Sequence, residues 1–302
     1  MALIDTIKKF RSKSKKPVAD GEGGEMSFLD HLEELRWHLL RSGTAIVVLA
    51  IVIFIYRKFV FDEVIFKVIS NEFPLNKWIC SFWNNGDGTC LEGISSKMQN
   101  LSPQAGFLKS IQVGFIGGII VAFPYIIWEI WAFIKPGLHK HERRAIRGSI
   151  FVISLLFFSG IAFGYYIISP FSLKFFHDFP FSENVENQWN FSVVVDLVTQ
   201  ITFFTGIIFQ LPVVMFYLAK MGLVTPAFLQ RYRRHAVAIL LLAAAIITPP
   251  DMISQVMIFI PLYGLYEVSI VVTGRVVKRR EKELAKEMAE RQKEQQEEKT
   301  SA

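Results

Sequence analysis

Long runs of apolar residues, separated by short polar segments, form the main pattern of this sequence. Several runs approach or exceed about 20 residues, the length that an α-helix needs to cross a membrane. We therefore expect an all-α, polytopic membrane protein with six transmembrane helices. The predicted spans are 37–56, 107–133, 148–170, 191–219, 235–247 and 252–273.

The last two predicted spans are short and are joined by the proline turn Thr248–Asp251. Residues 235–247 hold only about 13 apolar residues, so this helix needs either a thinned membrane or shielding by its neighbours. Pro124, Pro212 and Pro261 lie within three of the predicted spans and should kink them. Short and kinked helices together predict a curved, cup-like bundle.

The spans divide the chain into a leader, a membrane domain and a tail. Residues 1–25 are basic and rich in Gly and Glu, and we expect a mobile leader without a cleavable signal peptide. Residues 26–273 form the membrane domain, with external loops at 57–106 and 171–190. Residues 274–302 are rich in Lys, Arg, Glu and Gln, which predicts a charged, solvated tail.

Positive charge is distributed unevenly between the two sides of this topology. The 302-residue chain is 52% hydrophobic and only 20% charged, with a formal charge of +6. Its Lys and Arg lie between the apolar runs, which indicates orientation in a membrane rather than nucleic-acid binding. With six spans, the side of both termini carries 25 of them and the two larger opposite loops carry 5. Both termini are therefore predicted to be cytoplasmic, whereas an odd number of spans would scatter the basic loops over both faces.

The two cysteines, Cys80 and Cys90, both lie in the first external loop. An external compartment permits disulfides, and the segment WNNGDGT between them can turn the chain back. We predict a Cys80–Cys90 disulfide, with two free thiols as the alternative. No histidine lies nearby, so a metal site is not expected.

Four segments, in order along the chain, resemble one family. They are FLDHLEELRWHLLRS at the first span, FPYIIWEIWAFIKPGLHKHERR at the end of the second, LPVVMFYLAKMGLVTP in and after the fourth, and TPPDMISQ between the last two. Over about residues 26–273 the chain is similar to the TatC family, the multispanning receptor subunits of the twin-arginine translocase. The leader, the cysteine loop and the tail lie outside the resemblance.

Glu33, Glu34 and Arg36 directly precede the first span. A purely structural interpretation is available, since acids at the start of a helix complement its dipole and an arginine marks the membrane surface. The resemblance implies another role. In TatC-like proteins the glutamate at the position of Glu34 helps to recognise the paired arginines of a signal peptide, and we include Arg36 in this predicted site.

Glu142 lies in the polar tip that follows the second span, beside Arg143 and Arg144. In a solvated loop its ion pairs would contribute little to stability. A guanidinium ligand, however, pairs bidentately with carboxylates, so two arginines in tandem suit two carboxylates. The resemblance assigns this role to Glu142 and implicates Phe133 nearby. Arg143 is expected to orient the loop or balance its charge.

Two polar residues, Glu129 and Gln210, lie inside predicted spans. Such residues mark either a functional contact or a hydrogen bond between helices. TatC-like proteins often carry a glutamate where Gln210 stands, so this chain departs from the common pattern there. Asp251 in the proline turn is expected to cap the following helix, and it is a further candidate for partner contacts.

The resemblance implies a receptor and core subunit that recognises twin-arginine signal peptides at the cytoplasmic face of a bacterial inner membrane. Folded proteins would be exported there with energy from the proton-motive force. The implied partners are TatA-like and TatB-like single-span subunits, further copies of the chain and membrane lipid. Neither nucleic acid nor a cofactor is expected.

Two other classes of function fit the sequence less well. A secondary transporter for a small solute would show two related halves, and no such internal repeat is visible. An intramembrane enzyme would need a nucleophile–base pair or a motif such as HExxH within the spans, and neither is present. The sequence also lacks a GxxxxGK[ST] phosphate-binding loop, which fits transport without ATP hydrolysis by this chain. We therefore do not expect an enzyme.

Overall fold

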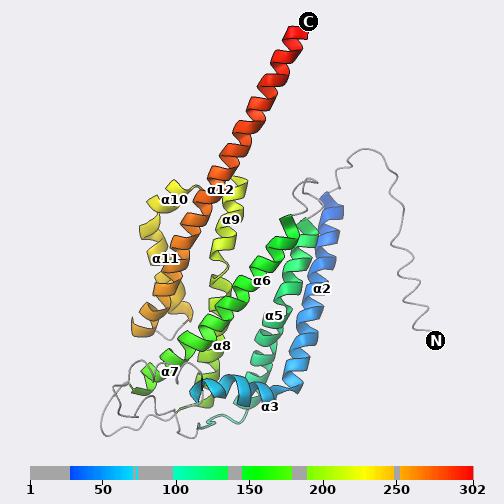
Figure 1. Cartoon of the computed structure of the whole chain (residues 1–302). Coiled ribbons are helices and arrows are strands. Elements are labelled where there is room, and N and C mark those ends of the chain that lie inside the picture. Colours follow the sequence, from blue (N-terminus) through cyan, green and yellow to red (C-terminus); the bar gives the residue numbers. More distant parts are fainter. Residues whose placement is uncertain are drawn as a thin grey trace, which may run out of the picture.

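The computed structural model is a bundle of helices (Figure 1). The structure describes residues 28–70, 73, 98–134, 145–178, 189–247 and 252–301. Within them the only pairing of extended chain is a single bridge between Gln99 and Asn190. The prediction of an all-α fold is therefore confirmed.

The helices follow the predicted spans in order. Their bounds are α2 Phe28–Ile55, α3 Arg57–Phe59, the π-helix η1 Val60–Ile65, the 3-10 helix η2 Phe66–Ile69, α5 Ala105–Ile134, α6 Ala145–Phe163, the π-helix η5 Gly164–Ile168, α7 Ser169–Asp178, α8 Phe191–Ile208, α9 Leu211–Met221, α10 Pro226–Arg231, α11 Arg233–Ile247 and α12 Met252–Ser301.

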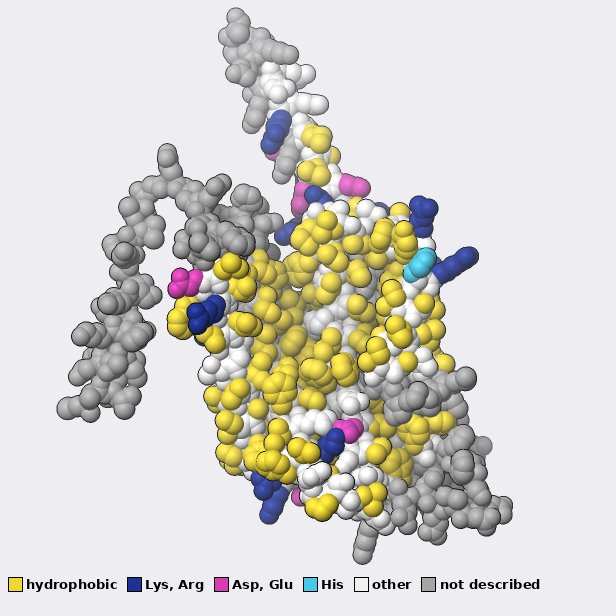
Figure 2. Space-filling model, turned by 180° about the vertical axis from the view of Figure 1, so that it is seen from behind, with side chains coloured by type: hydrophobic (Ala, Val, Ile, Leu, Met, Phe, Trp, Pro, Cys, Tyr) yellow, Lys and Arg dark blue, Asp and Glu magenta, His cyan; other side chains and the backbone are white. Residues whose placement is uncertain are grey.

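Five helical segments in the described part of the chain are long and apolar enough to cross a membrane. They are Leu32–Ile55, Ala105–Ile134, Gly148–Phe176, Phe191–Met221 and Ile258–Lys293. Helix α11 has 15 residues and falls short of the usual length of a span. The chain is thus polytopic, while the sixth span stays a prediction. Figure 2 shows the corresponding surface, a broad hydrophobic band with most charged side chains near its two ends.

The two ends of the bundle are distinct (Figure 1). The charged part of α12 projects from one end, which we call the arm end. Helix α2 begins, α5 ends, α6 begins and α9 ends at the arm end. The short helix α3 lies across the opposite end, which we call the α3 end. The start of α2, which carries Glu34, and the end of α5, which carries Phe133, therefore both lie at the arm end.

One proline lies at a break between two helices, and two others lie inside continuous helices. The predicted span 191–219 is two helices, because α8 ends at Ile208 and Pro212 starts α9. Proline suits the first turn of a helix because its missing N–H would have no partner there. Pro124 and Pro261 instead lie inside α5 and α12, which continue past them.

Glycines allow α2 and α5 to pack closely along their length. A Cβ atom on Gly118 would lie 2.9 Å from both the backbone N of Ala50 and the carbonyl oxygen of Ile46. On Gly114, one helical turn earlier, it would lie 3.1 Å from the carbonyl oxygen of Ala50. This GxxxG spacing on α5 brings two membrane helices into backbone contact. The contact fixes the register between the side chains of α2 and those of α5.

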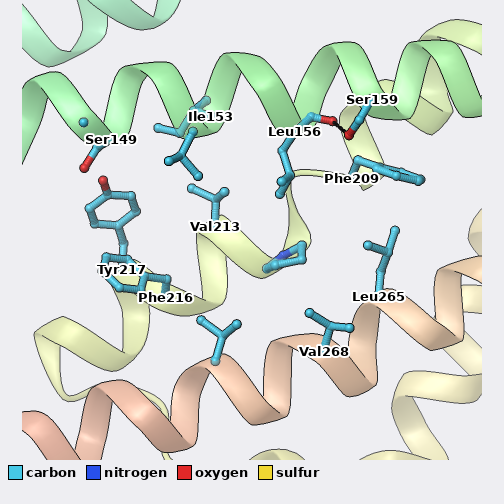
Figure 3. A pocket seen from close by; sticks show the side chains of 14 residues that line it. Ser149, Ile153, Leu156, Ser159, Phe209, Val213, Phe216, Tyr217, Leu265 and Val268 are labelled. Atoms are coloured by element: carbon cyan, nitrogen blue, oxygen red, sulfur yellow. Dashed lines mark hydrogen bonds between the residues drawn. The ribbon is translucent and has the colours of Figure 1, made fainter.

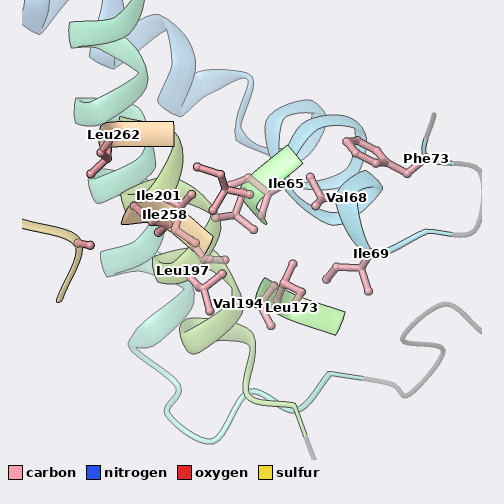
Figure 4. Packing of buried hydrophobic residues seen from close by; sticks show 14 of the residues in the cluster. Ile65, Val68, Ile69, Phe73, Leu173, Val194, Leu197, Ile201, Ile258 and Leu262 are labelled. Atoms are coloured by element: carbon pink, nitrogen blue, oxygen red, sulfur yellow. The ribbon is translucent and has the colours of Figure 1, made fainter. Parts of the chain in front are cut away.

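The main buried hydrophobic cluster lies toward the α3 end (Figure 4). It joins the segment η1–η2 to α7, α8 and α12. Its members include Ile65, Val68, Leu173, Val194, Ile201, Ile258 and Leu262. The cluster also continues along α12 to Ile270 and includes Leu229 of α10, toward the arm end.

Candidate functional site

A chain of polar side chains connects α2 with α5 at the arm end. Glu34 lies near the start of α2, and 36% of its side chain is exposed. His38 follows one turn later on the same face, with its Nε2 4.0 Å from Oε1 of Glu34. This distance is too long for a hydrogen bond, so the pair is a loose ionic contact at most. The Glu34 carboxylate therefore remains accessible to an external cation.

Glu129 of α5 occupies the buried end of this chain. Its side chain is only 2% exposed. Nδ1 of His38 forms a short hydrogen bond with one carboxylate oxygen of Glu129, and the hydroxyl of Tyr125 donates to the other at 2.6 Å. A buried carboxylate is costly unless its oxygens accept hydrogen bonds, and both oxygens do so here. The Glu129 carboxylate thus holds the imidazole ring of His38 in place.

Phe133 completes the group from the same helix as Glu129. Its ring meets the imidazole of His38 edge-on, with centroids 6.2 Å apart and an interplanar angle of 65°. Of the predicted residues, the structure therefore brings Glu34, Glu129 and Phe133 together around His38. Arg36 lies on α2 between Glu34 and His38 in the sequence and is exposed, and a spacing of two residues places it on a different face of the helix. We call Glu34, His38, Glu129, Tyr125 and Phe133 the α2–α5 cluster.

Several predicted site residues fall outside the described part of the chain. They are Glu142, Arg143, Asp251, Cys80 and Cys90. The second carboxylate of the predicted signal-peptide site and the predicted disulfide accordingly stay predictions. In the described part, no three His, Cys, Asp or Glu side chains are grouped closely enough to hold a metal ion.

Gln210 lies at the break between α8 and α9, away from the α2–α5 cluster. Its amide donates to the carbonyl oxygen of Ile153 on α6 at 3.3 Å, which ties the break to a neighbouring helix. Beside it, α6, α9 and α12 enclose an apolar cavity of about 530 Å³ (Figure 3). The hydroxyls of Ser149 and Tyr217 face one another at one edge of this cavity.

Two features of the polar network were missed in the sequence. His38 lies within the segment FLDHLEELRWHLLRS, and its spacing of one helical turn from Glu34 was a signal that the two side chains share a face of the helix. Lys109 and Asp196 are charged residues inside predicted spans, which was a direct signal of pairing. Nζ of Lys109 lies 2.5 and 2.6 Å from the two carboxylate oxygens of Asp196, and Gln112 donates to the same carboxylate at 2.8 Å. This second network joins α5 to α8 near the α3 end.

Comparison with known proteins places this architecture in one family. The family model described as "Sec-independent protein translocase protein (TatC)" matches residues 30–261. The TatC protein of Blattabacterium sp. subsp. Periplaneta americana is 34% identical over 263 residues, with 86% of this chain and 99% of that protein covered. TatCy of Bacillus subtilis is 33% identical, with 86% of this chain and 94% of that protein covered.

Solved structures agree with the sequence comparison. A crystal structure of the twin-arginine translocase receptor TatC superposes with a TM-score of 0.66 at 30% identity, covering 80% of this chain and 97% of the other. A second crystal structure of that receptor, in the detergent DDM, gives a TM-score of 0.67. This chain, with its α2–α5 cluster, therefore belongs to the TatC family of Sec-independent protein translocase proteins.

Proposed function

We propose that this chain is the receptor and core subunit of a twin-arginine translocase, and that it binds the paired arginines of signal peptides through Glu34 and Glu142. The observation that carries the proposal is the arrangement of the α2–α5 cluster. It presents the partly exposed carboxylate of Glu34 one helical turn from His38, and His38 in turn contacts the ring of Phe133 and the buried Glu129. Family membership supports the assignment to a translocase.

The chemistry of the cluster suits a guanidinium ligand. Glu129 is buried, and its two oxygens already accept from His38 and Tyr125, so it is poorly placed to bind a ligand. Glu34 accepts no close hydrogen bond from the described side chains and can pair bidentately with an arginine. The edge of Phe133 adds an apolar contact for the peptide that follows the arginines. Glu142, predicted from the sequence, supplies the second carboxylate.

Membership of this family also suggests the membrane, the orientation, the partners and the energy source of the chain. The chain works in a bacterial inner membrane, with both termini and the arm end on the cytoplasmic side. The preponderance of Lys and Arg in the segments at this end supports that orientation. TatA-like and TatB-like single-span subunits and further copies of this chain are its partners. Export of folded proteins draws on the proton-motive force.

A peptide-binding experiment tests the recognition step. The full chain in lipid nanodiscs is titrated with a labelled signal peptide that carries two arginines, and with a twin-lysine version. We expect tighter binding of the twin-arginine peptide. Glu34→Gln and Glu142→Gln should each weaken it about tenfold, because the neutral amide keeps an acceptor but loses the charge that strengthens a bidentate pair with arginine, a loss of about 1.4 kcal/mol.

Glu33→Gln is the matched control. It removes the same charge from the neighbouring residue of α2, whose side chain is exposed. We expect its affinity to stay within about twofold of the unmodified chain, since adjacent residues of a helix point to different faces and the exposed Glu33 side chain cannot pair with the same arginine. Equal affinity for both peptides, or equal losses in Glu33→Gln and Glu34→Gln, would contradict the proposal.

A further inference from the structure

A cavity of about 560 Å³ opens at the α3 end, far from the α2–α5 cluster. It lies where α2 turns into α3 and η1, and the first turns of α5 and α8 close its other side. Much of its wall is aromatic. The phenylalanines that line it are Phe54, Phe61, Phe66, Phe107 and Phe191. Phe61 and Phe191 pack with centroids 5.6 Å apart, so this wall is formed by side chains that support one another.

Two cations stand at the mouth of the cavity. Arg57 and Lys58 line it and are exposed, and neither forms an ion pair with another described residue. The guanidinium of Arg57 lies 5.2 Å from the ring centroid of Phe54, a cation–π contact that restrains it against the wall. Asp62 is the one acid of the lining, so the lining carries a net charge of +1.

The position of these cations relative to the membrane indicates the ligand. The membrane-spanning part of α2 ends at Ile55, directly before Arg57 and Lys58. Charged side chains at the end of a span lie at the depth of the lipid headgroups. The segment α3–η1 then runs across the end of the bundle rather than along it (Figure 1). The cavity is therefore open where phosphates and glycerol groups are concentrated.

We propose that this cavity is a binding site for an anionic phospholipid, with its phosphodiester held by Arg57 and Lys58. The phenylalanine wall packs against the glycerol and the first acyl carbons, which a soluble phosphate would leave uncovered. A headgroup of the phosphatidylglycerol class fits best because it has no ammonium group for the two cations to repel. The lipid would fix the corner between α2 and α3, and this role is independent of signal-peptide recognition.

Lipid retention by the purified full chain tests the site. The protein is exchanged into detergent micelles that contain phosphatidylglycerol or phosphatidylcholine, and native mass spectrometry counts the bound lipids. We expect phosphatidylglycerol to be retained preferentially. Arg57→Gln and Lys58→Gln should each lower its apparent affinity about fivefold, since one basic residue near anionic lipid contributes about 1 kcal/mol. Lys67→Gln is the control, because Lys67 pairs with Glu63 and lies outside the lining.

A second pair of variants separates a filled cavity from simple surface attraction. A Cβ on Gly106, which lines the cavity, would meet no atom within 4 Å, so Gly106→Leu fills open space and leaves both cations in place. Gly43 on α2 has the same free space but lies outside the lining, so Gly43→Leu is its match. Loss of phosphatidylglycerol in Gly106→Leu alone supports the proposal.

Three results would overturn the lipid site. They are equal retention of the two lipids by the unmodified chain, unchanged retention in the Arg57, Lys58 and Gly106 variants, and complete displacement of the lipid by millimolar inorganic phosphate. Elution of each variant as a monodisperse peak, together with unchanged binding of the twin-arginine peptide, shows that the variants are folded. Because that peptide contacts the arm end, its failure to bind the unmodified chain would count against the proposed function and not against this site.

Discussion

The hydrogen bonds of Glu129 explain why a carboxylate is tolerated near the end of a membrane helix. A buried acid that accepts two hydrogen bonds avoids much of the cost of leaving water. His38 and Tyr125 supply these bonds from two different helices. The first role of His38 and Tyr125 is therefore to stabilise the buried Glu129 carboxylate. The accessible carboxylate of the cluster is that of Glu34.

Replacement of His38 should destabilise the protein. His38→Ala leaves one oxygen of a buried carboxylate without a donor, which costs about 1–3 kcal/mol. Thermal unfolding of the purified protein in detergent, followed by tryptophan fluorescence, measures this change. The control is Thr44→Ala on the same helix, because the hydroxyl of Thr44 bonds only to the carbonyl of Leu40. A His38→Ala protein as stable as Thr44→Ala would show that His38 does not support Glu129.

At the scale of single helices, the close contact of α2 with α5 determines whether the α2–α5 cluster can form. Glu34 and His38 belong to one helix, and Glu129 and Phe133 belong to the other. Their side chains meet only if the two backbones keep the observed register. Gly118 lies at the tightest point of this contact, against backbone atoms that cannot rotate away.

Adjacent glycines in α5 allow a matched test of this contact. Gly118→Ala places a methyl group 2.9 Å from backbone atoms of α2 and should destabilise the protein by about 1–3 kcal/mol. Gly117→Ala meets only the flexible end of the Ile53 side chain, also at 2.9 Å, so we expect a much smaller loss. Thermal unfolding of both variants measures the difference. Equal destabilisation of the two would contradict a backbone contact at Gly118.

The helices themselves were predictable because long apolar runs leave few alternatives in a membrane. Their interruptions were harder to predict. Pro212 was expected to interrupt one span, and α8 ends at Ile208 while α9 begins at Leu211, directly before this proline. Pro124 and Pro261 were expected to kink their spans; α5 and α12 are continuous there, and the two kinks stay predictions. Helix continuity at a proline depends on how neighbouring helices satisfy the freed carbonyl, which the local sequence does not specify.

For the whole molecule, the sequence motifs identified Glu34 and Phe133, but not how they are connected. Hydrophobic periodicity is a property of one segment, whereas the bonds of Glu129 depend on the register between α2 and α5. For the same reason, the sequence showed Glu129 only as an acid inside a span, whereas the structure shows its carboxylate hydrogen-bonded to His38 and Tyr125. Lys109 and Asp196 are 87 residues apart, and their ion pair forms because α5 packs on α8. The sequence alone does not show which helices pack together.

The projecting part of α12 should contribute little to stability beyond Arg280. Its described side chains from Glu281 to Lys293 are exposed. The guanidinium of Arg280 lies against Gly222, where α9 ends in a left-handed conformation with φ of 82°. A cation at the C-terminus of a helix is favourable by about 0.3–1 kcal/mol. Removal of residues 288–302 should therefore change the unfolding free energy by less than about 0.5 kcal/mol.

Arg280→Gln in the full chain is the companion variant for this truncation. It keeps the whole projection and removes only the charge beside Gly222, so it should be less stable than the truncated protein. Thermal unfolding in detergent compares the two. A truncation that destabilises the protein more than Arg280→Gln would show that the distal part of α12 packs on the bundle.

Pro261 gives the long helix α12 a mechanical property. A proline within a helix removes one backbone hydrogen bond and lowers the resistance to bending at that point. From Pro261 to Ser301 the helix is about 60 Å long at 1.5 Å per residue. Between Pro261 and Arg280, however, buried side chains pack α12 against α9 and α11, and Arg280 lies against Gly222, so this packing resists a bend at the proline. The part of α12 that can swing freely begins after Arg280 and is about 30 Å long at 1.5 Å per residue.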